Sequence, residues 1–533
     1  MSNTNPQTLT ELLARRVAVG GAAIMDRDQP MTAAALEAES QRVAQGLHDL
    51  GVREGDRVAI WLPNVPAWLA CFFACARLGA IVVAVNTRFR SSEVADIVGR
   101  SGAKVLVYWP GYRGIDFAGI LNDAGADALK GLVAIVAYDE EAAAPVLPVA
   151  RTLLGHTVKP YRDLAACAPY AHDNARPDLG CLVFTTSGTT KLPKFVLHHQ
   201  ASIASHAAEA ARGFGYGDEG AVTLLTVPMC GTFGMSHALS PLAGGRIVVM
   251  IPTFEAQAAA HAIRTHKVTH FPATGDIVAQ LLAASNEPIP YPSVRMVIGV
   301  RAGQAAPAQA RGLTMVAVYG SSEMQAVLSH QPLDAPPAQR EIGGGKLVTQ
   351  ATQVRARHTE TEKILPHGEA GELEFKGPSG LMGYYGNAEA TAAAFTDDGF
   401  FKSGDLGYTV AVGDFVFLSR IGDVLRLSGF LVNPLEIEAV LDAHPSVAVS
   451  QVVGIDGPRG PMPVAFVLPK NGGGSANVDE AALIAHCKKQ IAHYKVPHHV
   501  LPIDAFPFTP SANGNKIQKA KLREMAAAAL QGK

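Results

Sequence analysis

The chain has 533 residues, of which 48% are hydrophobic and 17% are charged, and it contains 52 glycines and 34 prolines. This length predicts a large N-terminal body with appended units, and the composition is typical of a loop-rich globular α/β enzyme, which excludes a disordered or coiled-coil protein. The net charge of -2, from 45 basic and 47 acidic side chains without a dense basic run, argues against nucleic acid as a partner.

The cysteines and the apolar segments bear on the cellular setting. Six cysteines are scattered without CxxC spacing, which favours a reducing, cytoplasmic compartment. The N-terminal segment MSNTNPQTLTELLARR has no basic stretch followed by an apolar one, so we expect no secretory signal. The one membrane-like stretch, residues 68–85, carries Arg77 and Gly79 near its middle. It predicts a buried helix followed by a buried strand, and no membrane span.

The first 330 residues predict parallel βα units. From about residue 30, segments with helical periodicity alternate with short apolar strands. Three examples are TAAALEAESQRVAQGLHDLG followed by RVAIWLP, SSEVADIVGRSG followed by AKVLVYW, and AQAAAHAIRTHK followed by VTHFPA.

The pattern changes after about residue 340. Short strands with glycine-rich turns, as in GEAGELEFKGP and FFKSGDLGYTVAVGDFVFLSR, predict a β-rich subdomain. Beyond a polar, glycine-bearing stretch at residues 420–429, PLEIEAVLDAH and DEAALIAHCKKQI predict helices, and VSQVVGI and PVAFVLP predict strands. We therefore predict two domains, residues 1–420 and residues 421–533.

The clearest local motif is TTSGTTKLPK at residues 185–194, directly after the apolar strand CLVF. Its hydroxyls and backbone amides could donate to phosphate oxygens, and its two lysines supply positive charge. It lacks the GK[ST] ending of the familiar nucleotide loop, and a solvated turn is the alternative interpretation. The preceding strand and the lysines favour phosphate binding.

This segment resembles the phosphate-binding signature of the adenylate-forming superfamily, which includes acyl-CoA synthetases, adenylation domains and luciferases. Four more segments, in the order of that family, extend the resemblance over roughly residues 180–520. They are VYGSSE at 318–323, similar to YGxTE; KSGDLG at 402–407, similar to TGDLG; RIGD at 420–423 with SGFLVNPLEIE at 428–438, similar to the start of the C-terminal domain; and GNKIQK at 514–519, similar to the segment with the catalytic lysine.

The resemblance implies the α/β fold of these enzymes, with a large N-terminal αβ body, a β-rich subdomain and a small mobile C-terminal α+β domain. It also implies an ATP-dependent acid:CoA ligase that forms an acyl-adenylate, releases pyrophosphate and transfers the acyl group to coenzyme A. ATP, Mg²⁺ and coenzyme A are the implied cofactors. Since this chemistry joins two anions, it needs positioning and cations. By resemblance, Lys516 would bridge the carboxylate and the α-phosphate, and Glu323 would hold Mg²⁺ on the phosphates.

The resemblance also implies a nucleotide site. Asp405 would accept hydrogen bonds from both ribose hydroxyls, Tyr319 would offer a flat face to adenine, and Arg420 would lie near the ribose. Taken alone, Asp405 could be a turn-forming residue and Tyr319 a core aromatic. The implied ATP/AMP-binding residues are Thr186, Ser187, Gly188, Thr189, Thr190, Lys194, Tyr319, Gly320, Ser322, Asp405 and Arg420.

For the acid, the resemblance implies a pocket. Gly320 lies where short-chain members have tryptophan, which predicts room for more than acetate. Arg301 could pair with a second carboxylate or be solvated at the rim, and Cys230 is not expected to be a nucleophile because nothing nearby marks a lowered thiol pKa. We expect a medium-chain fatty or aromatic acid. The implied wall comprises Met229, Cys230, Phe233, Gly299, Arg301, Gly303, Val318 and Met324.

Two glycines are implied in the second half-reaction. Gly422 lies where the family has its pivot, and Gly429 would lie beside the path of the pantetheine arm. Two alternatives remain, an acyl-AMP ligase that loads a carrier protein and a catalytically silent binding homologue; the presence of Lys516, Glu323 and Asp405 argues against the second. The expected partners are small molecules, with a homodimer as a candidate assembly.

Overall fold

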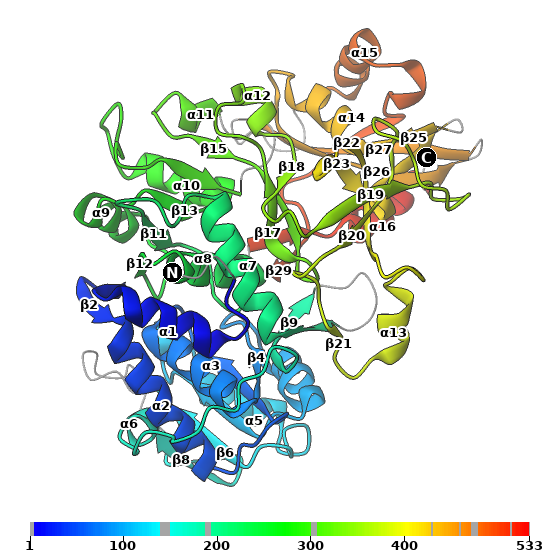
Figure 1. Cartoon of the computed structure of the whole chain (residues 1–533). Coiled ribbons are helices and arrows are strands. Elements are labelled where there is room, and N and C mark those ends of the chain that lie inside the picture. The colour runs from blue at the N-terminus through cyan, green and yellow to red at the C-terminus, as the bar shows by residue number, and fades with distance from the viewer. Residues whose placement is uncertain are drawn as a thin grey trace. The chain divides into compact units, whose positions relative to one another are not determined.

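The structure is a computed structural model of the chain (Figure 1). It describes residues 5–138, 150–186, 193–299, 306–427, 430–457, 460–470, 478–511 and 514–531. The chain forms two compact units. Unit 1 comprises Met1–Gln353 and Phe375–Phe401, unit 2 comprises Val354–Glu374 and Lys402–Lys533, and each is described by itself.

The first large sheet of unit 1 has nine strands in the order β21-β10-β9-β4-β3-β5-β6-β8-β7. The strands from β9 to β8 in this order are parallel, whereas β10, β21 and β7 are antiparallel to their neighbours. Strands β4, β5 and β6 are buried along their whole length, as expected for strands covered on both faces. The bounds are β3 (Arg57–Trp61), β4 (Ile81–Ala84), β5 (Val105–Tyr108), β6 (Ala134–Ala137), β7 (Thr152–Leu153), β8 (His156–Pro160), β9 (Gly180–Thr186), β10 (Lys194–His199) and β21 (Gly383–Tyr384).

The second large sheet of unit 1 has seven strands in the order β15-β14-β13-β11-β12-β1-β2. All its strand pairs are parallel except the hairpin of β1 and β2. The prediction of parallel βα units is therefore confirmed. The bounds are β1 (Ala22–Asp26), β2 (Gln29–Thr32), β11 (Val222–Leu225), β12 (Ile247–Met250), β13 (His270–Pro272), β14 (Met296–Ile298) and β15 (Met315–Val316).

The helices of unit 1 agree with the three predicted helix-strand pairs, with α2 before β3, α4 before β5 and α9 before β13. A single π-helical segment, Ala95–Gly99, continues α4. The bounds are α1 (Leu9–Val19), α2 (Ala33–Asp49), α3 (Pro66–Leu78), α4 (Ser91–Val94), α5 (Phe117–Ala124), α6 (Tyr161–Ala165), α7 (Gln200–Gly213), α8 (Thr232–Ala243), α9 (Ala256–His266), α10 (Gly275–Ala283), α11 (Ala306–Gln309), α12 (Pro337–Arg340) and α13 (Ala388–Ala393).

The apolar stretch at residues 68–85 is the buried helix α3 followed by the buried strand β4, as predicted. Pro66 occupies the first turn of α3, where its missing N–H removes no helical bond, and Gly79 ends the helix with φ 71°. Within the described ranges, no helix is long and apolar enough to cross a membrane.

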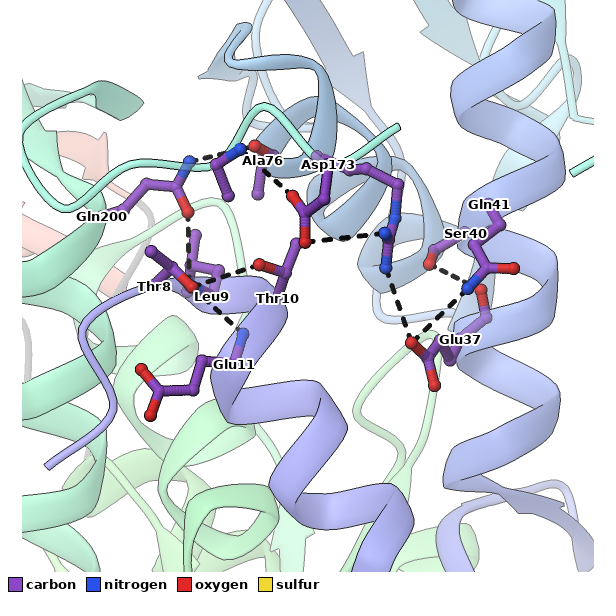
Figure 2. Close-up of polar contacts among 12 residues, drawn as sticks. Thr8, Leu9, Thr10, Glu11, Glu37, Ser40, Gln41, Ala76, Asp173 and Gln200 are labelled. Atoms are coloured by element: carbon purple, nitrogen blue, oxygen red, sulfur yellow. Dashed lines mark hydrogen bonds and ion pairs between the residues drawn. The ribbon is translucent and has the colours of Figure 1, made fainter. Parts of the chain in front are cut away.

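One buried side chain connects three helices of unit 1. Figure 2 shows Gln200, the first residue of α7, between α1 and α3. The backbone N–H of Leu9 donates to Gln200 Oε1 (3.2 Å), and Gln200 Nε2 donates to the carbonyl of Ala76 (2.9 Å). Because Gln200 is fully buried and follows β10 directly, these bonds fix the end of the strand that begins at Lys194.

The β-rich segment predicted from about residue 340 is confirmed, and strands of this kind begin earlier, at Val318. In unit 1, β16 and β17 form an antiparallel hairpin, and β18 pairs with β17. The later strands lie mostly in unit 2, where β22 and β23 form an antiparallel hairpin. The bounds are β16 (Val318–Ser321), β17 (Gln325–His330), β18 (Gly344–Leu347), β19 (Gln353–Arg357), β20 (Gly371–Lys376), β22 (Phe401–Ala411) and β23 (Asp414–Arg420).

The C-terminal part of unit 2 has the predicted mixture of helices and strands around a core that contains Val432, Ile437 and Leu483. Strands β26 and β27 are antiparallel, and β28 joins β27 in parallel. The bounds are α14 (Pro434–Asp442), α15 (Glu480–Gln490), α16 (Lys519–Gln531), β24 (Leu425–Leu427), β25 (Phe430–Val432), β26 (Val447–Gly457), β27 (Gly460–Pro469), β28 (His499–Pro502), β29 (Phe508–Ser511) and β30 (Gly514–Ile517).

The two units do not divide the chain at one point. Residues 402–420 pack with the C-terminal segment because β22 and β23 belong to unit 2. The predicted domain boundary between residues 420 and 421 stays a prediction.

Candidate active site

The hydroxyl-rich segment at residues 185–194 joins two antiparallel strands. Thr186 ends β9 and pairs with Lys194, the first residue of β10. The apolar residues of β9 are buried, so the strand fixes the position at which the segment begins. Ser187, Gly188, Thr189 and Thr190 lie outside the described residues. The segment thus connects a strand to a strand, unlike a nucleotide loop that opens a helix.

Lys194 and Glu323, predicted from motifs that are far apart in sequence, meet at the same tyrosine. Lys194 Nζ lies 4.5 Å from the ring centroid of Tyr384, and the Tyr384 hydroxyl donates to Glu323 Oε1 at 3.0 Å. Strand β21 places Tyr384 there by pairing with β10, where Val196 is its ladder partner. The sequence analysis missed Tyr384, although an aromatic pair between glycines, GYYG, was a visible signal.

Ser322 and Glu323 lie in the tight turn between β16 and β17. The backbone N–H of Met324, a buried residue, donates to Ser321 Oγ (3.1 Å). The N–H of Leu381 donates to the carbonyl of Glu323 (2.7 Å). These bonds fix the backbone on both sides of the Glu323 carboxylate.

A buried histidine supports the same turn. Nε2 of His198 lies 2.7 Å from the carbonyl oxygen of Ser322, and because a carbonyl only accepts, the ring N–H donates. Burial lowers the pKa of His198 to about 4, so the ring is neutral at neutral pH. His198 was not predicted; its signal was a histidine pair at the end of the apolar strand KFVL.

Tyr319, the predicted adenine contact, is buried in β16. Its ring stacks on Phe375 with the ring centroids 5.3 Å apart and 27° between the planes. Phe375 therefore covers one face of the ring, and adenine stacking on Tyr319 stays a prediction.

The expectation that Gly320 opens the acid pocket is corrected by the structure. A Cβ at Gly320 would lie 2.3 Å from the carbonyl carbon and oxygen of Ala326 and 2.4 Å from the carbonyl oxygen of Gln325. A side chain here would enter strand β17 and not a pocket. Glycine is required by the close approach of the two strands, so it carries no information on the size of the acid.

Three residues of the predicted acid wall lie together. A Cβ at Gly299, which has φ 108°, would lie 2.8 Å from Cζ of Phe233, so glycine lets this ring approach the backbone. Val318 packs against the apolar cluster that contains Phe233 and Ile298. Arg301 and Gly303 lie outside the described residues.

The segment before α8 carries Met229 and Cys230, both of which are buried. Asn64 holds this segment, since its Oδ1 accepts from the N–H of Met229 (2.9 Å) and its Nδ2 donates to the carbonyl of Val227 (3.0 Å). Burial raises the pKa of the Cys230 thiol to about 12, in agreement with the prediction that Cys230 is not a nucleophile. Asn64 was missed; a polar residue within the apolar stretch LPNVPAW was the available signal.

In unit 2, Asp405 and Arg420 are partners across the hairpin of β22 and β23. Arg420 Nε lies 3.0 Å from Asp405 Oδ1, and Arg420 also donates to the carbonyl of Ser403 (3.0 Å). The Asp405 side chain is 3% exposed and that of Arg420 is 50% exposed. The arginine thus pairs with a buried carboxylate and orients it, as a ribose acceptor requires.

The remaining predicted residues of unit 2 lie on short elements. Gly422 is exposed in a 3₁₀ turn, Ile421–Asp423, with no atom within 4 Å of a Cβ at its position. Its carbonyl accepts from Arg523 (2.9 Å), which also contacts Asp423 Oδ1 (3.1 Å). The backbone of Lys516 lies in β30 and pairs with Thr509, and its side chain is outside the described part. Gly429 is likewise outside it.

A 540 Å³ cavity in unit 1 is lined by residues other than the predicted ones. Its wall includes Trp109 and Tyr112, and the Tyr112 hydroxyl donates to the carbonyl of Pro252 (2.7 Å). Among the acid-wall residues that the structure describes, none lines this cavity.

The donor chemistry near Glu323 fits magnesium. Across the part of the chain that the structure describes, no group of three or more His, Cys, Asp and Glu side chains could hold a metal by itself. Mg²⁺ takes hard oxygen ligands and is commonly held by one or two carboxylates together with substrate phosphates. The Glu323 carboxylate, which accepts a hydrogen bond from Tyr384, has the chemistry of such a ligand, and its binding of Mg²⁺ stays a prediction.

Family models match most of the chain. The model described as "AMP-binding enzyme" matches residues 13–385, and the model described as "AMP-binding enzyme C-terminal domain" matches residues 436–513.

Individual relatives match over nearly their whole length. The chain is 30% identical over 515 residues to a 3-[(3aS,4S,7aS)-7a-methyl-1,5-dioxo-octahydro-1H-inden-4-yl]propanoyl:CoA ligase from Mycobacterium tuberculosis, covering 94% of this chain and 95% of the relative. It is 29% identical to a sulfoacetate–CoA ligase from Cupriavidus necator, with 93% of each chain covered. The solved structure of ATP-bound MatB from Rhodopseudomonas palustris is similar with a TM-score of 0.80 and 25% identity, over 96% of this chain and 98% of that one.

Proposed function

The chain belongs to the AMP-binding enzyme family, and from this premise we propose that the acid it activates is a medium-chain fatty acid or an aromatic acid. The general reaction is an AMP-forming ligation of an acid to coenzyme A, with ATP and Mg²⁺ as cofactors. The proposal concerns the acid, the residues that act on it and the point at which the chain pivots.

The apolar wall carries the proposal for the acid. Phe233, Gly299 and Val318 come together from α8, the end of β14 and β16, beside an apolar cluster and the buried ring of His237, which lies 4.5 Å from that of Phe233. An aromatic or aliphatic body would gain burial there, at roughly 0.8 kcal/mol per CH₂ group. The bicyclic acid named for the Mycobacterium tuberculosis relative supports a large apolar substrate.

The relative named as a sulfoacetate–CoA ligase points to a second class of acid that should be tested as a substrate. Sulfoacetate carries a second anionic group, and Arg301 is the residue predicted either to pair with such a group or to be solvated. Acids with two anionic groups therefore belong in any substrate screen. Their use in preference to apolar acids would overturn the proposed substrate class.

The first half-reaction forms the acyl-adenylate. A carboxylate oxygen attacks the α-phosphorus of ATP, the bond from that phosphorus to the β-phosphate oxygen breaks, and pyrophosphate leaves. We assign Lys516 to the two anions, Glu323 to Mg²⁺, Asp405 with Arg420 to the ribose, and Tyr319 to adenine. Mg²⁺, when bound, supplies charge neutralisation at the phosphates.

The phosphate contacts are assigned to the segment between β9 and β10. Lys194 supports this role, because the ring of Tyr384 holds its ammonium at the first residue of β10. The proposed set in and beside this segment is Thr186, Ser187, Gly188, Thr189, Thr190 and Lys194, with Gly320 and Ser322 on the β16–β17 hairpin.

The second half-reaction transfers the acyl group. The thiolate of coenzyme A attacks the acyl carbon, the bond to the phosphate oxygen breaks, and AMP leaves. We propose that residues 421–533 pivot about Gly422 between the half-reactions and that Gly429 borders the pantetheine path. The absence of any atom within 4 Å of a Cβ at Gly422 supports this assignment, and the bond from Arg523 to its carbonyl would have to open or move with the pivot.

The cysteines support the proposed cytoplasmic setting. Cys71, Cys75, Cys181, Cys230 and Cys487 are buried free thiols, and Cys167 is partly exposed. Free thiols are typical of reducing compartments. A homodimer is the proposed assembly; sedimentation analysis at assay concentrations tests it, and a monomer there would contradict it.

A pyrophosphate-release screen over a panel of acids, with and without coenzyme A, tests the function. The panel contains acetate, medium-chain fatty acids, benzoate-type acids, and dicarboxylic and sulfonated acids. We expect release with the apolar acids, and thioester only when coenzyme A is present. Adenylate that forms but never reaches coenzyme A would favour the carrier-protein alternative, and no release with any acid would contradict an active ligase.

A further inference from the structure

We propose that Tyr384 is a positioning residue that joins the phosphate-binding lysine to the magnesium-binding glutamate, an inference that rests on the proposed role of Glu323. Its hydroxyl sets the orientation of the Glu323 carboxylate, and the face of its ring sets the place of the Lys194 ammonium. We therefore expect the gain in ATP affinity that Mg²⁺ produces to depend on Tyr384.

Both contacts of Tyr384 are close. The hydroxyl donates to Glu323 Oε1 at 3.0 Å, and the ammonium of Lys194 lies 4.5 Å from the ring centroid. Tyr384 is 6% exposed, whereas Lys194 and Glu323 are half-buried, so each contact is shielded from solvent on the side of the tyrosine. Hydrogen bonds to charged acceptors are roughly twice as strong as neutral ones, and desolvation strengthens cation–π contacts.

The position of Tyr384 is itself fixed. Its N–H donates to Thr391 Oγ1 (2.9 Å), and that hydroxyl donates to the carbonyl of Asn387 (2.8 Å). The N–H of Tyr385 donates to the carbonyl of Phe195, one residue after Lys194 (2.8 Å). A ring held by its own strand pairing can orient two flexible charged side chains, each of which would otherwise lose rotamer freedom when ATP binds.

The hydroxyl and the ring of Tyr384 contact different charged groups, and we expect them to have separate effects. With one carboxylate oxygen bonded to the tyrosine hydroxyl, the second oxygen of Glu323 has a defined direction for a hard cation. The ring acts separately on Lys194, whose charge meets phosphate whether or not the metal is present. Loss of the hydroxyl should therefore weaken ATP binding in the presence of Mg²⁺. Loss of the ring should weaken ATP binding both with and without Mg²⁺.

Calorimetric titration with ATP, in Mg²⁺ and in EDTA, separates these effects without any need to know the acid. We expect Tyr384→Phe to weaken ATP binding about tenfold in Mg²⁺ and less than about twofold in EDTA. Tyr384→Leu should weaken both, by a further few-fold. Tyr385→Phe is the matched control, since it removes a neighbouring hydroxyl and should bind ATP as the wild type does. Thermal unfolding of each variant checks that the fold is retained.

Glu323→Gln distinguishes failure of this inference from failure of the proposed function. If Glu323→Gln loses the Mg²⁺ effect and folded Tyr384→Phe keeps it, the inference about Tyr384 is wrong and the role of Glu323 stands. If Glu323→Gln keeps the full Mg²⁺ effect, the proposed metal role of Glu323 is wrong and the inference fails with it. The double variant Glu323→Gln/Tyr384→Phe should bind ATP no more weakly in Mg²⁺ than Glu323→Gln does, because the Tyr384 hydroxyl acts through the Glu323 carboxylate. Additive losses of ATP affinity would overturn the inference.

Discussion

The site residues of unit 1 and those of unit 2 are held in different ways. In unit 1, Lys194 and Glu323 are joined by the buried Tyr384, and neutral His198 supports the turn before Glu323. In unit 2, Gly422 is exposed, a Cβ at its position would meet no atom within 4 Å, and its carbonyl accepts one hydrogen bond from Arg523. The difference suggests that unit 1 keeps a fixed frame for the phosphates, whereas the segment at Gly422 keeps the conformational freedom that a pivot needs.

The largest expected effect comes from removal of Lys516, the lysine proposed to act in adenylation. Lys516→Ala should slow adenylation by about 100- to 1000-fold, because the proposed role of Lys516 is to supply positive charge to the developing anion. Thioester formation from chemically prepared acyl-AMP should stay within a few-fold of wild type. Separate assays of pyrophosphate release and thioester formation measure this, and retained adenylation would remove Lys516 from the mechanism.

A matched pair of glycines tests the contrast in packing. Gly320→Ala places a Cβ 2.3 Å from the backbone of Ala326, so we expect a loss of about 1–3 kcal/mol in unfolding free energy. Gly422→Ala meets no atom within 4 Å and should change it by less than about 0.5 kcal/mol. Denaturant titration of both variants measures the difference. Equal losses would show that the two segments are packed alike.

The freedom of the segment at Gly422 is tested by proline. Gly422→Pro fixes φ and removes a donor, so it should slow thioester formation about tenfold and leave pyrophosphate release near normal. Gly422→Ala is the control and should leave both half-reactions near wild type. Equal losses in both half-reactions for the proline variant would contradict a pivot at Gly422.

The smallest expected effect is on the pH dependence of the unfolding free energy, through His198 in unit 1. The pKa of His198 is about 4 in the folded state and about 6.5 when unfolded, so between these values the unfolded chain binds the extra proton. Its contribution to stability is complete above pH 6.5 and is lost as the pH falls toward 4, at no more than about 1.4 kcal/mol per pH unit. His198→Gln should therefore show a shallower loss of unfolding free energy between pH 6.5 and 5. His172→Gln, at an exposed histidine, should match the wild-type slope.

The elements of this protein could largely be predicted from its sequence. The apolar run at residues 68–85 became α3 and β4, and the alternation of helices and strands became parallel sheets. The sequence could not show the direction of a side chain at Gly320, because that direction depends on how closely β17 approaches β16. The inference of an open pocket from that glycine failed for this reason.

The motifs determined which chemistry this chain can perform. Hydroxyls, lysines and carboxylates in a fixed order are a local property, and their resemblance to the motifs of the adenylate-forming family implied ATP, Mg²⁺ and acid activation without coordinates. Only the tertiary structure could decide which of these groups share a support. Tyr384 lies 190 residues after Lys194 and 61 after Glu323, and pairing of β21 with β10 is what places its ring beneath one and its hydroxyl against the other. Such contacts depend on strand pairing between distant segments, which no local pattern in the sequence specifies.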